Sequence, residues 1–256
     1  MISCNKLIPF FLILGCKTNK FTPLILTMIA ENLQFLRKRI NDICKRTNRN
    51  PNDVKLIAVS KTFGVDVIEL AVQAGQLEFG ENKAQELVTK FDIIGSRVVW
   101  HFIGRLQRNK VKNAVRTSDY IHSVDSLLLA ADIQNHAERL EKKQKVLVQV
   151  KTSDEETKSG VSEKSELKRI VEFCSKSTHI DLIGLMTISA LTEDKNLIRK
   201  SFTDLRNLKE ELNSEGYNLK ELSMGMTNDY EIAIEEGATM LRIGSAIFGE
   251  RFYNKE

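Results

Sequence analysis

The sequence contains little of several residue types that mark specialised structures. Among 256 residues there are 3 Pro, 13 Gly, 4 Cys and 1 Trp, too few for a collagen-like, low-complexity or disulfide-framework protein. Hydrophobic residues make up 42% of the chain, which excludes a disordered polymer of low hydrophobicity. No apolar run is long enough to span a bilayer. The chain can therefore bury one large core or two small ones.

Motifs for metal or nucleotide binding are also absent. No metal-ligand spacing such as His-Glu-x-x-His joins the four histidines His101, His122, His136 and His179. There is no Gly-x-Gly-x-x-Gly and no Walker-type loop. Cys44 and Cys174 lie far apart without a Cys-x-x-Cys spacing. We therefore expect no metal site, reduced structural thiols and a cytoplasmic location.

Residues 1–27 differ in composition from the rest of the chain. They contain two of the three prolines, two of the four cysteines and an apolar run at Leu7–Leu14. The run has the length of a signal-peptide core, and Ile13-Leu14-Gly15-Cys16 is similar to a lipoprotein cleavage box. We interpret residues 1–27 as an extension or leader outside the fold, with Met28 opening the folded unit. Export or targeting is the alternative.

The net charge of +4 is unevenly distributed. Residues 1–30 carry three lysines and no acid, so the remainder is close to neutral. One basic cluster without an acid comprises Arg105, Arg108, Lys110, Lys112 and Arg116. A run of this kind is usually a solvated helix face, and nucleic-acid binding is the alternative. We expect neither a nucleic-acid nor a membrane partner, and a monomer.

After residue 28 the apolar residues follow regular periods. A first amphipathic helix is predicted from spacings of three and four at Ile29, Leu33, Leu36, Ile40 and Ile43. Strand-like runs then alternate with helical patterns. The predicted strands are Lys55–Ser60, Glu78–Gly80, Val98–Ile103, Tyr120–Ser123, Val146–Val150, Leu182–Met186, Glu221–Ser223 and Met240–Ile243. The predicted helices lie near Val65–Gln73, Lys83–Phe91, Gln107–Arg116, Ser126–Glu141, Glu163–Ser175, Asn196–Glu215, Tyr230–Glu236 and Ile247–Phe248.

Eight strands, each followed by a helix, indicate an α/β protein. We predict a single parallel (β/α)8 barrel of the TIM type over residues 28–256, with an extra N-terminal helix. A doubly wound open sheet is the competing architecture, but the number and even spacing of the strands favour the barrel. Functional residues of such barrels gather at the carboxyl ends of the strands.

Lys61 directly follows the first predicted strand. Desolvation at a barrel mouth lowers the pKa of an amine, and a neutral amine can form a Schiff base with a carbonyl. The alternative is a lysine that extends from the strand end into solvent.

Two glycine-containing turns follow the last two predicted strands, at Ser223–Met226 and Arg242–Ser245. Backbone amides and hydroxyls there can bind phosphate, although either turn alone can simply connect a strand to a helix. With Lys61 they indicate an aldehyde-binding amine opposite a phosphate site, and pyridoxal 5′-phosphate (PLP) has both groups. Arg242 can face a pyridine nitrogen. The alternative for Arg242 is a salt bridge to Glu81 or Glu235.

Many segments then resemble, in order, the pyridoxal phosphate homeostasis protein family. They include Ala58-Val59-Ser60-Lys61-Thr62, Phe79-Gly80-Glu81-Asn82, Trp100-His101-Phe102-Ile103-Gly104, Gly184-Leu185-Met186-Thr187, Leu222-Ser223-Met224-Gly225-Met226 and Arg242-Ile243-Gly244-Ser245. The resemblance runs from about Ile29 to Tyr253. It implies a fold-type III barrel like the N-terminal domain of alanine racemase.

The resemblance also implies roles for individual residues. Lys61 would carry PLP as a Schiff base, and Arg242 would face the pyridine nitrogen. Ser223, Gly244 and Ser245 match phosphate-binding positions. Asn82, Met224 and His101 match positions near the ring or at the mouth. Departures from the family pattern fall in outer loops, at Lys151, Arg105, Arg108 and Ser189-Ala190.

The family implies a protein of intracellular PLP homeostasis and cofactor supply, with PLP-dependent apo-enzymes as recipients. We expect no catalytic residues, because a racemase of this barrel type needs a tyrosine from a second domain and only about a dozen residues follow the eighth strand. A low-activity amino-acid racemase is the alternative. Asp125 and His122 after the fourth strand suggest a relay, or simply hydrogen-bonded packing at a strand end.

Overall fold

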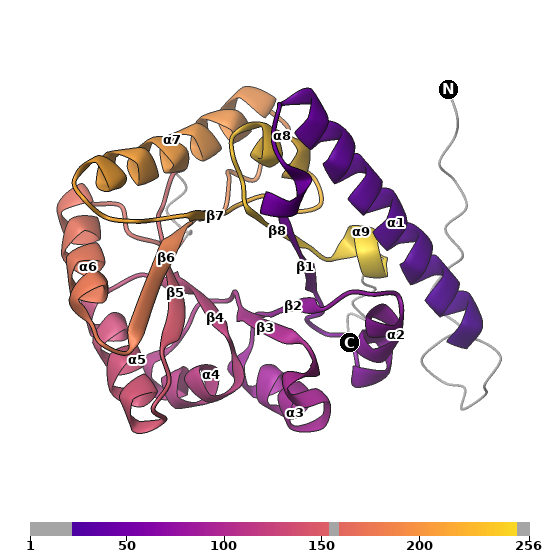
Figure 1. The fold of residues 1–256 in the computed structure, drawn as a ribbon, viewed down its shortest axis with the longest axis horizontal. Coiled ribbons are helices and arrows are strands. Elements are labelled where there is room, and N and C mark those ends of the chain that lie inside the picture. Colours follow the sequence, from indigo (N-terminus) through magenta and orange to yellow (C-terminus); the bar gives the residue numbers. More distant parts are fainter. Residues whose placement is uncertain (1–21, 154–158, 250–256) are drawn as a thin grey trace.

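The computed structural model describes residues 22–153 and 159–249. Eight strands pair in parallel, and β8 closes against β1 to form a barrel (Figure 1). The strands are β1 (Lys55–Val59), β2 (Glu78–Glu81), β3 (Val99–Phe102), β4 (Tyr120–Val124), β5 (Gln144–Gln149), β6 (Ile180–Met186), β7 (Glu221–Ser223) and β8 (Met240–Ile243). The predicted (β/α)8 barrel is confirmed, and every predicted strand overlaps an observed one.

Helices surround the barrel on its outside (Figure 1). They are α1 (Thr22–Arg46), α2 (Val65–Gln73), α3 (Ala84–Ile94), α4 (Val111–Thr117), α5 (Leu127–Arg139), α6 (Lys164–Lys176), α7 (Lys195–Ser214), α8 (Tyr230–Glu235) and α9 (Ser245–Phe248). Short 3-10 turns are η2 (Pro51–Asp53), η3 (Gly95–Arg97) and η4 (Arg108–Lys110). The helix predicted near Gln107–Arg116 is thus a 3-10 turn followed by a shorter helix, and Lys110 (φ −108°, ψ −1°) is the residue directly before α4.

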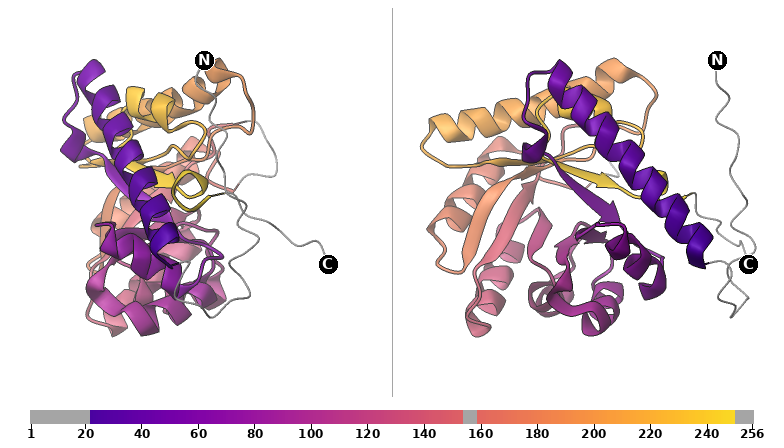
Figure 2. Two further views of the ribbon diagram at one scale, coloured as in Figure 1. Left: turned by 90° about the vertical axis from the view of Figure 1, so that its right-hand side faces the viewer. Right: turned by 45° about the vertical axis from the view of Figure 1, so that its right-hand side comes forward.

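Helix α1 starts earlier than predicted. It packs against α2, α8 and α9 on the outside of the barrel (Figure 2). Ile25 is only 9% exposed and extends the buried stripe of Ile29 and Leu33 by one turn. Pro23 is tolerated because the first turn of a helix needs no intrahelical donor. The boundary predicted at residue 28 therefore falls inside a helix. The leader role of the preceding residues stays a prediction, and residues 1–21 lie outside the described residues.

The core has two layers, because successive side chains of a barrel strand alternate between inside and outside. Large side chains such as Trp100, Phe79 and Phe202 are fully buried in the main core, which includes most of the helix faces. A small apolar cluster within the barrel contains Ile57, Leu147, Met186 and Met240. Buried polar side chains, among them His101, His122 and Arg242, also lie in the interior. Across residues 22–153 and 159–249, no helix is long and apolar enough to cross a membrane.

Candidate functional site

Closure of the barrel brings the predicted site residues to neighbouring strand ends. Strands β7, β8, β1 and β2 are consecutive around the closed sheet. Ala58 of β1 is in register with Ile243 of β8. Lys61 and Ser245 therefore follow adjacent strand ends, and Asn82 follows the next strand, β2. Lys61 and Ser245 are more than 180 positions apart in the chain, yet both lie with Asn82 on one side of the carboxyl edge.

The turn that carries Lys61 is held from both sides. Ser60 Oγ donates to Glu81 Oε1 at 2.6 Å. Thr62 adopts φ 73°, which is unfavourable for a β-branched residue, and its amide donates to Glu86 Oε1 at 2.6 Å. Such a conformation costs on the order of 1–3 kcal/mol and persists where the surroundings enforce it. The hydrogen bonds to Glu81 and Glu86 therefore hold the backbone on both sides of Lys61 in place.

Lys90, which is only 4% exposed, organises this support. Its Nζ donates to Glu81 Oε1 at 2.6 Å, to Glu86 Oε1 at 2.7 Å and to the carbonyl of Ser60 at 2.9 Å. Burial raises the pKa of Glu81, although Lys90 opposes the shift. Glu81 Oε2 has no hydrogen-bond partner among the described residues. Sequence analysis missed Lys90, because a lysine in a helical pattern gives no sign that it points inward.

Arg242 lies at the end of β8 and is 4% exposed. Its Nη1 donates to Ser223 Oγ at 2.6 Å and its Nη2 to the carbonyl of Thr187 at 2.8 Å. Burial lowers the pKa of Arg242 to about 10, with Asp229 opposing the shift. The guanidinium therefore remains a fixed cation at neutral pH.

The alternative of a salt bridge from Arg242 to Glu81 or Glu235 is wrong. Glu81 pairs with Lys90, and Glu235 pairs with Arg199 at 2.6 Å on the outer surface. These two acids lie on other elements and already have cations of their own.

The two glycine turns meet at the carboxyl edge. Gly225 has φ 93°, and a Cβ there would lie 2.6 Å from Ala233 Cβ, so only glycine lets this loop fold onto α8. Ser245 Oγ lies 3.0 Å from Thr227 Oγ1, and Gly244 directly precedes α9. Thr227 was not predicted, although it follows Met226 in the same turn. The two hydroxyls form a polar pair on partly open surface.

Three of the predicted residues do not present their side chains at the mouth. Met224 is fully buried in the main core, since strand alternation directs it outward from the barrel. Ser223 is fully buried below the edge, where its hydroxyl contacts Arg242 and His122. His101 points into the barrel interior and contacts His122. The placement of His101 at the mouth is therefore corrected.

Asn82 is half-buried beside a close backbone approach. A Cβ on Gly104 would lie 2.1 Å from the Asn82 carbonyl oxygen. Glycine at position 104 therefore lets the loop after β3 pack directly on the segment that carries Asn82.

Two further groups singled out in the sequence lie outside the mouth, namely the basic cluster and His122. Arg108 pairs with Asp132 at 2.6 Å and Arg116 with Asp92 at 3.0 Å, as expected of a solvated helix face. His122 contacts His101 and Ser223 instead of forming a relay with Asp125. No group of three metal-ligating side chains occurs in the part of the chain that the structure describes.

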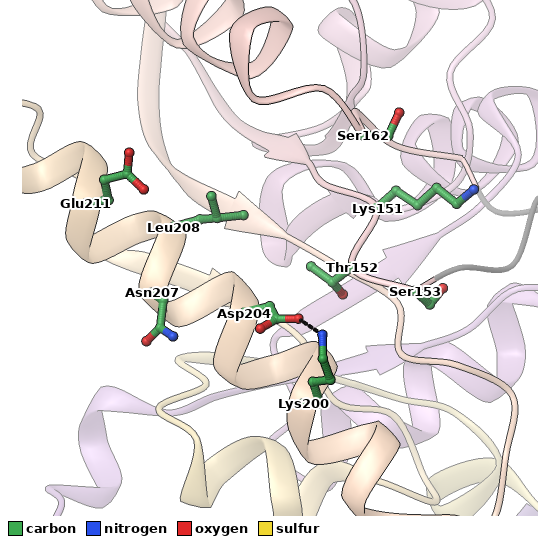
Figure 3. Close-up of a pocket in the computed structure, with 9 residues that line it drawn as sticks. All are labelled: Lys151, Thr152, Ser153, Ser162, Lys200, Asp204, Asn207, Leu208 and Glu211. Atoms are coloured by element: carbon green, nitrogen blue, oxygen red, sulfur yellow. Dashed lines mark hydrogen bonds and ion pairs between the residues drawn. The ribbon is translucent and has the colours of Figure 1, made fainter.

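A groove of about 610 Å³ lies away from these residues (Figure 3). One face of α7 lines it with Lys200 and Asp204, which form an ion pair at 2.7 Å. Lys151 and Ser162 lie on the opposite side (Figure 3). None of the eight predicted site residues lines the groove. Its mixed charge gives no preference for one ligand class.

Comparisons with known proteins agree with this architecture. Residues 31–252 match the family model described as alanine racemase, N-terminal domain. A pyridoxal phosphate homeostasis protein of Aquifex aeolicus is 42% identical over 227 residues, 88% of this chain and 99% of that protein. PipY of Synechococcus elongatus PCC7942, solved with PLP bound, has a TM-score of 0.77 and 35% identity over 86% of this chain and 100% of that one. An alanine racemase of Clostridium difficile 630 has a TM-score of 0.71 at 19% identity, covering 88% of this chain and 61% of that one.

The fold and these matches define a barrel of the alanine racemase N-terminal-domain class. Within that class, the identity to full-length relatives is decisive: this chain belongs to the pyridoxal phosphate homeostasis protein family. The resemblance inferred from the sequence motifs is confirmed.

Proposed function

We propose that this protein binds PLP on Lys61 and acts in PLP homeostasis, holding the cofactor and supplying it to apo-enzymes without turning over a substrate. One observation carries the proposal: β8 closes on β1, so Lys61 follows the strand end next to the one that carries Arg242 and Ser245. The names of the relatives and the PLP bound to PipY support it.

The residues present fit the chemical groups of the cofactor. PLP supplies an aldehyde that condenses with a primary amine, and Lys61 is the amine at this edge. Ser245, Thr227 and the backbone at Gly244 would hold the phosphate, because hydroxyls and amides are suitable donors to it. Arg242 would face the pyridine nitrogen, and its charge would keep that nitrogen unprotonated.

The proposal assigns supporting roles to the remaining predicted residues. Asn82 would lie beside the ring. Ser223 and His101 would act through Arg242 without touching the cofactor, because their side chains lie in the barrel interior. Met224 would contribute backbone alone, since its side chain is buried in the core.

The position of the tyrosines favours a carrier over the alternative racemase. Tyr120 lies inside the barrel and stacks on His101 with 4.4 Å between ring centroids. The hydroxyl of Tyr230 is 3.4 Å from Glu231 on the α1 side. Tyr217 packs against the main core. None of these three described tyrosines offers a second acid or base on the open face of the site.

We further propose a cytoplasmic monomer. Cys44 and Cys174 are free and buried, and burial raises the pKa of Cys174 to about 12, which keeps it as an inert thiol. Light scattering should report one chain of 29.1 kDa.

A transfer experiment tests the function directly. The PLP-loaded protein, freed of unbound cofactor, is mixed with the apo-form of a PLP-dependent enzyme, and recovery of that enzyme's activity is followed. We expect recovery to saturate at one PLP per chain. Lys61→Ala, treated identically, should give no recovery. Failure of the wild-type protein to retain PLP or to release it to the apo-enzyme would contradict the proposal.

A further inference from the structure

A continuous line of polar side chains crosses the interior of the barrel. Glu78 Oε2 lies 2.5 Å from His101 Nε2, and His101 Nδ1 lies 2.9 Å from His122 Nε2. His122 Nδ1 lies 2.8 Å from Ser223 Oγ, which accepts from Arg242 Nη1 at 2.6 Å. The line starts at the first residue of β2, passes through β3 and β4, and crosses the interior to β7 and β8.

The chemistry at its two ends fixes the direction of every hydrogen bond. A carboxylate can only accept, so His101 donates from Nε2 to Glu78 and its Nδ1 must accept from His122 Nε2. His122 Nδ1 then accepts from the Ser223 hydroxyl, whose oxygen accepts from Arg242. With both imidazoles neutral, no other arrangement satisfies all four contacts. All the donors point the same way, so each bond polarises the next.

Burial supports the neutral state of both imidazoles. His101 and His122 are each 0% exposed. Burial lowers the pKa of His101, although Glu78 opposes the shift. Burial and then the neighbouring His101 lower the pKa of His122 well below its usual value. Arg242 keeps its charge, so the line joins a buried cation to a carboxylate that is 28% exposed at the other end of the barrel.

The charged groups around this line already have partners. Lys55 pairs with Glu221 at 2.5 Å on the first residues of β1 and β7. Lys145 of β5 lies 4.8 Å from the ring centroid of Tyr120 and donates to its hydroxyl. Asp229, near Arg242, accepts from Ser189 Oγ at 2.6 Å. Within residues 22–153 and 159–249, the chain of hydrogen bonds that begins at Arg242 ends at the carboxylate of Glu78.

We propose that Glu78, His101, His122 and Ser223 are positioning residues that lock the guanidinium of Arg242 and join its charge to the N-terminal end of the barrel. The orientation of Arg242 toward bound PLP then depends on a carboxylate at the opposite end from the mouth. This consequence rests on the proposed function, because Arg242 affects the cofactor only if PLP binds above it. The hydrogen-bonded line from Glu78 to Arg242 is itself present in the protein without ligand.

The ligand-free chain provides the first test. Histidine side-chain ¹⁵N NMR distinguishes the tautomers, with His101→Asn and His122→Asn used for assignment. We expect His101 and His122 both to carry the proton on Nε2 and to stay neutral at pH 7. In Glu78→Gln the amide oxygen can still accept, so the tautomers should persist with a shifted His101 signal. A proton on Nδ1 of either ring, or a charged ring, would overturn the proposal.

The PLP-loaded protein provides the second test. Glu78→Gln removes the far charge, and Glu221→Gln is the matched control, since it neutralises a carboxylate at the same end outside the line. We expect Glu78→Gln to shift the pH midpoint of the visible PLP absorbance by about half a pH unit or more, and Glu221→Gln to shift it less. Equal shifts would overturn the proposal. Absence of PLP binding by the wild type would refute the proposed function alone. The NMR result would still test the hydrogen-bonded line between Glu78 and Arg242.

Discussion

The guanidinium of Arg242 and the hydroxyl of Ser223 meet 2.6 Å apart inside the barrel, with Arg242 4% and Ser223 0% exposed. Ser223 stands where the family resemblance implies a phosphate ligand. Its hydroxyl contacts Arg242 and His122, so we propose that it supports Arg242, while the more exposed hydroxyls of Ser245 and Thr227 are the proposed phosphate donors.

Replacement of these two serines separates the roles. Ser223→Ala leaves a buried Arg242 N–H and His122 Nδ1 without a partner, so we expect it to lower the free energy of unfolding by about 1–3 kcal/mol. Ser245→Ala removes an exposed hydroxyl and should leave stability unchanged. It should instead weaken PLP binding about tenfold, the equivalent of roughly one hydrogen bond to a charged group. Urea unfolding and PLP titration of both variants provide the measurements, and the reverse pattern would contradict these roles.

Lys90→Met tests the support beneath Lys61. The change leaves Glu81 buried without its cation, and breaking a buried ion pair in this way costs about 3–5 kcal/mol. We expect a large drop in the urea midpoint and poorer retention of PLP, because Ser60 loses the Lys90 contact. Lys176→Met breaks an exposed pair with Glu172 and is the matched control. Similar effects from both variants would refute a special role for Lys90.

Stability should fall in mild acid because of the two interior histidines. Burial lowers the pKa of His101 and of His122 below 6.5 in the folded protein, whereas the unfolded chain titrates near 6.5. Below that pH the unfolded state therefore binds more protons than the folded state. The free energy of unfolding is thus at its full value above pH 6.5 and decreases as the pH falls toward the lowered pKa values of the two histidines.

Thermal unfolding at a series of pH values measures the effect. The decrease in Tm below pH 6.5 should be shallower in His122→Asn than in the wild type. His136→Asn, on helix α5, is the control. Parallel curves for the wild type and His122→Asn would show that His122 does not contribute.

The barrel could be predicted from the sequence because its signals are local. Several strands, such as Lys55–Val59, contain a short apolar run that a helical pattern follows, and periodicity reveals both. The start of α1 lies before the predicted boundary at Met28, because that boundary rests on the composition of residues 1–27, whereas burial of Ile25 extends the helix toward the N-terminus. Such packing is not visible in the sequence spacing alone.

The site was predictable to the extent that its residues follow strands directly. Lys61 and Ser245 follow β1 and β8, and Arg242 lies near the end of β8, so all three could be proposed from their positions alone. The interior line could not, because the contact of His122 with Ser223 joins residues 101 positions apart across a closed sheet. Only the barrel closure and the strand register determine which inward side chains meet.

Tests of proton exchange distinguish the carrier from a racemase. The PLP-loaded protein is incubated with several amino acids in deuterated water, and deuterium at the α-carbon is measured by mass spectrometry. We expect no exchange beyond that with free PLP, because no described tyrosine reaches the open face of the site. Faster exchange that disappears in Lys61→Ala would identify a weak racemase instead.

Attachment of PLP to Lys61 is tested most directly by borohydride reduction of the PLP-loaded protein, followed by intact mass and peptide mapping. We predict one reduced pyridoxyl phosphate group per chain, located on Lys61, and none in Lys61→Ala. Lys90→Arg, which keeps the buried cation, should be labelled like the wild type. A label on another lysine, or an undiminished label in Lys61→Ala, would contradict the central claim.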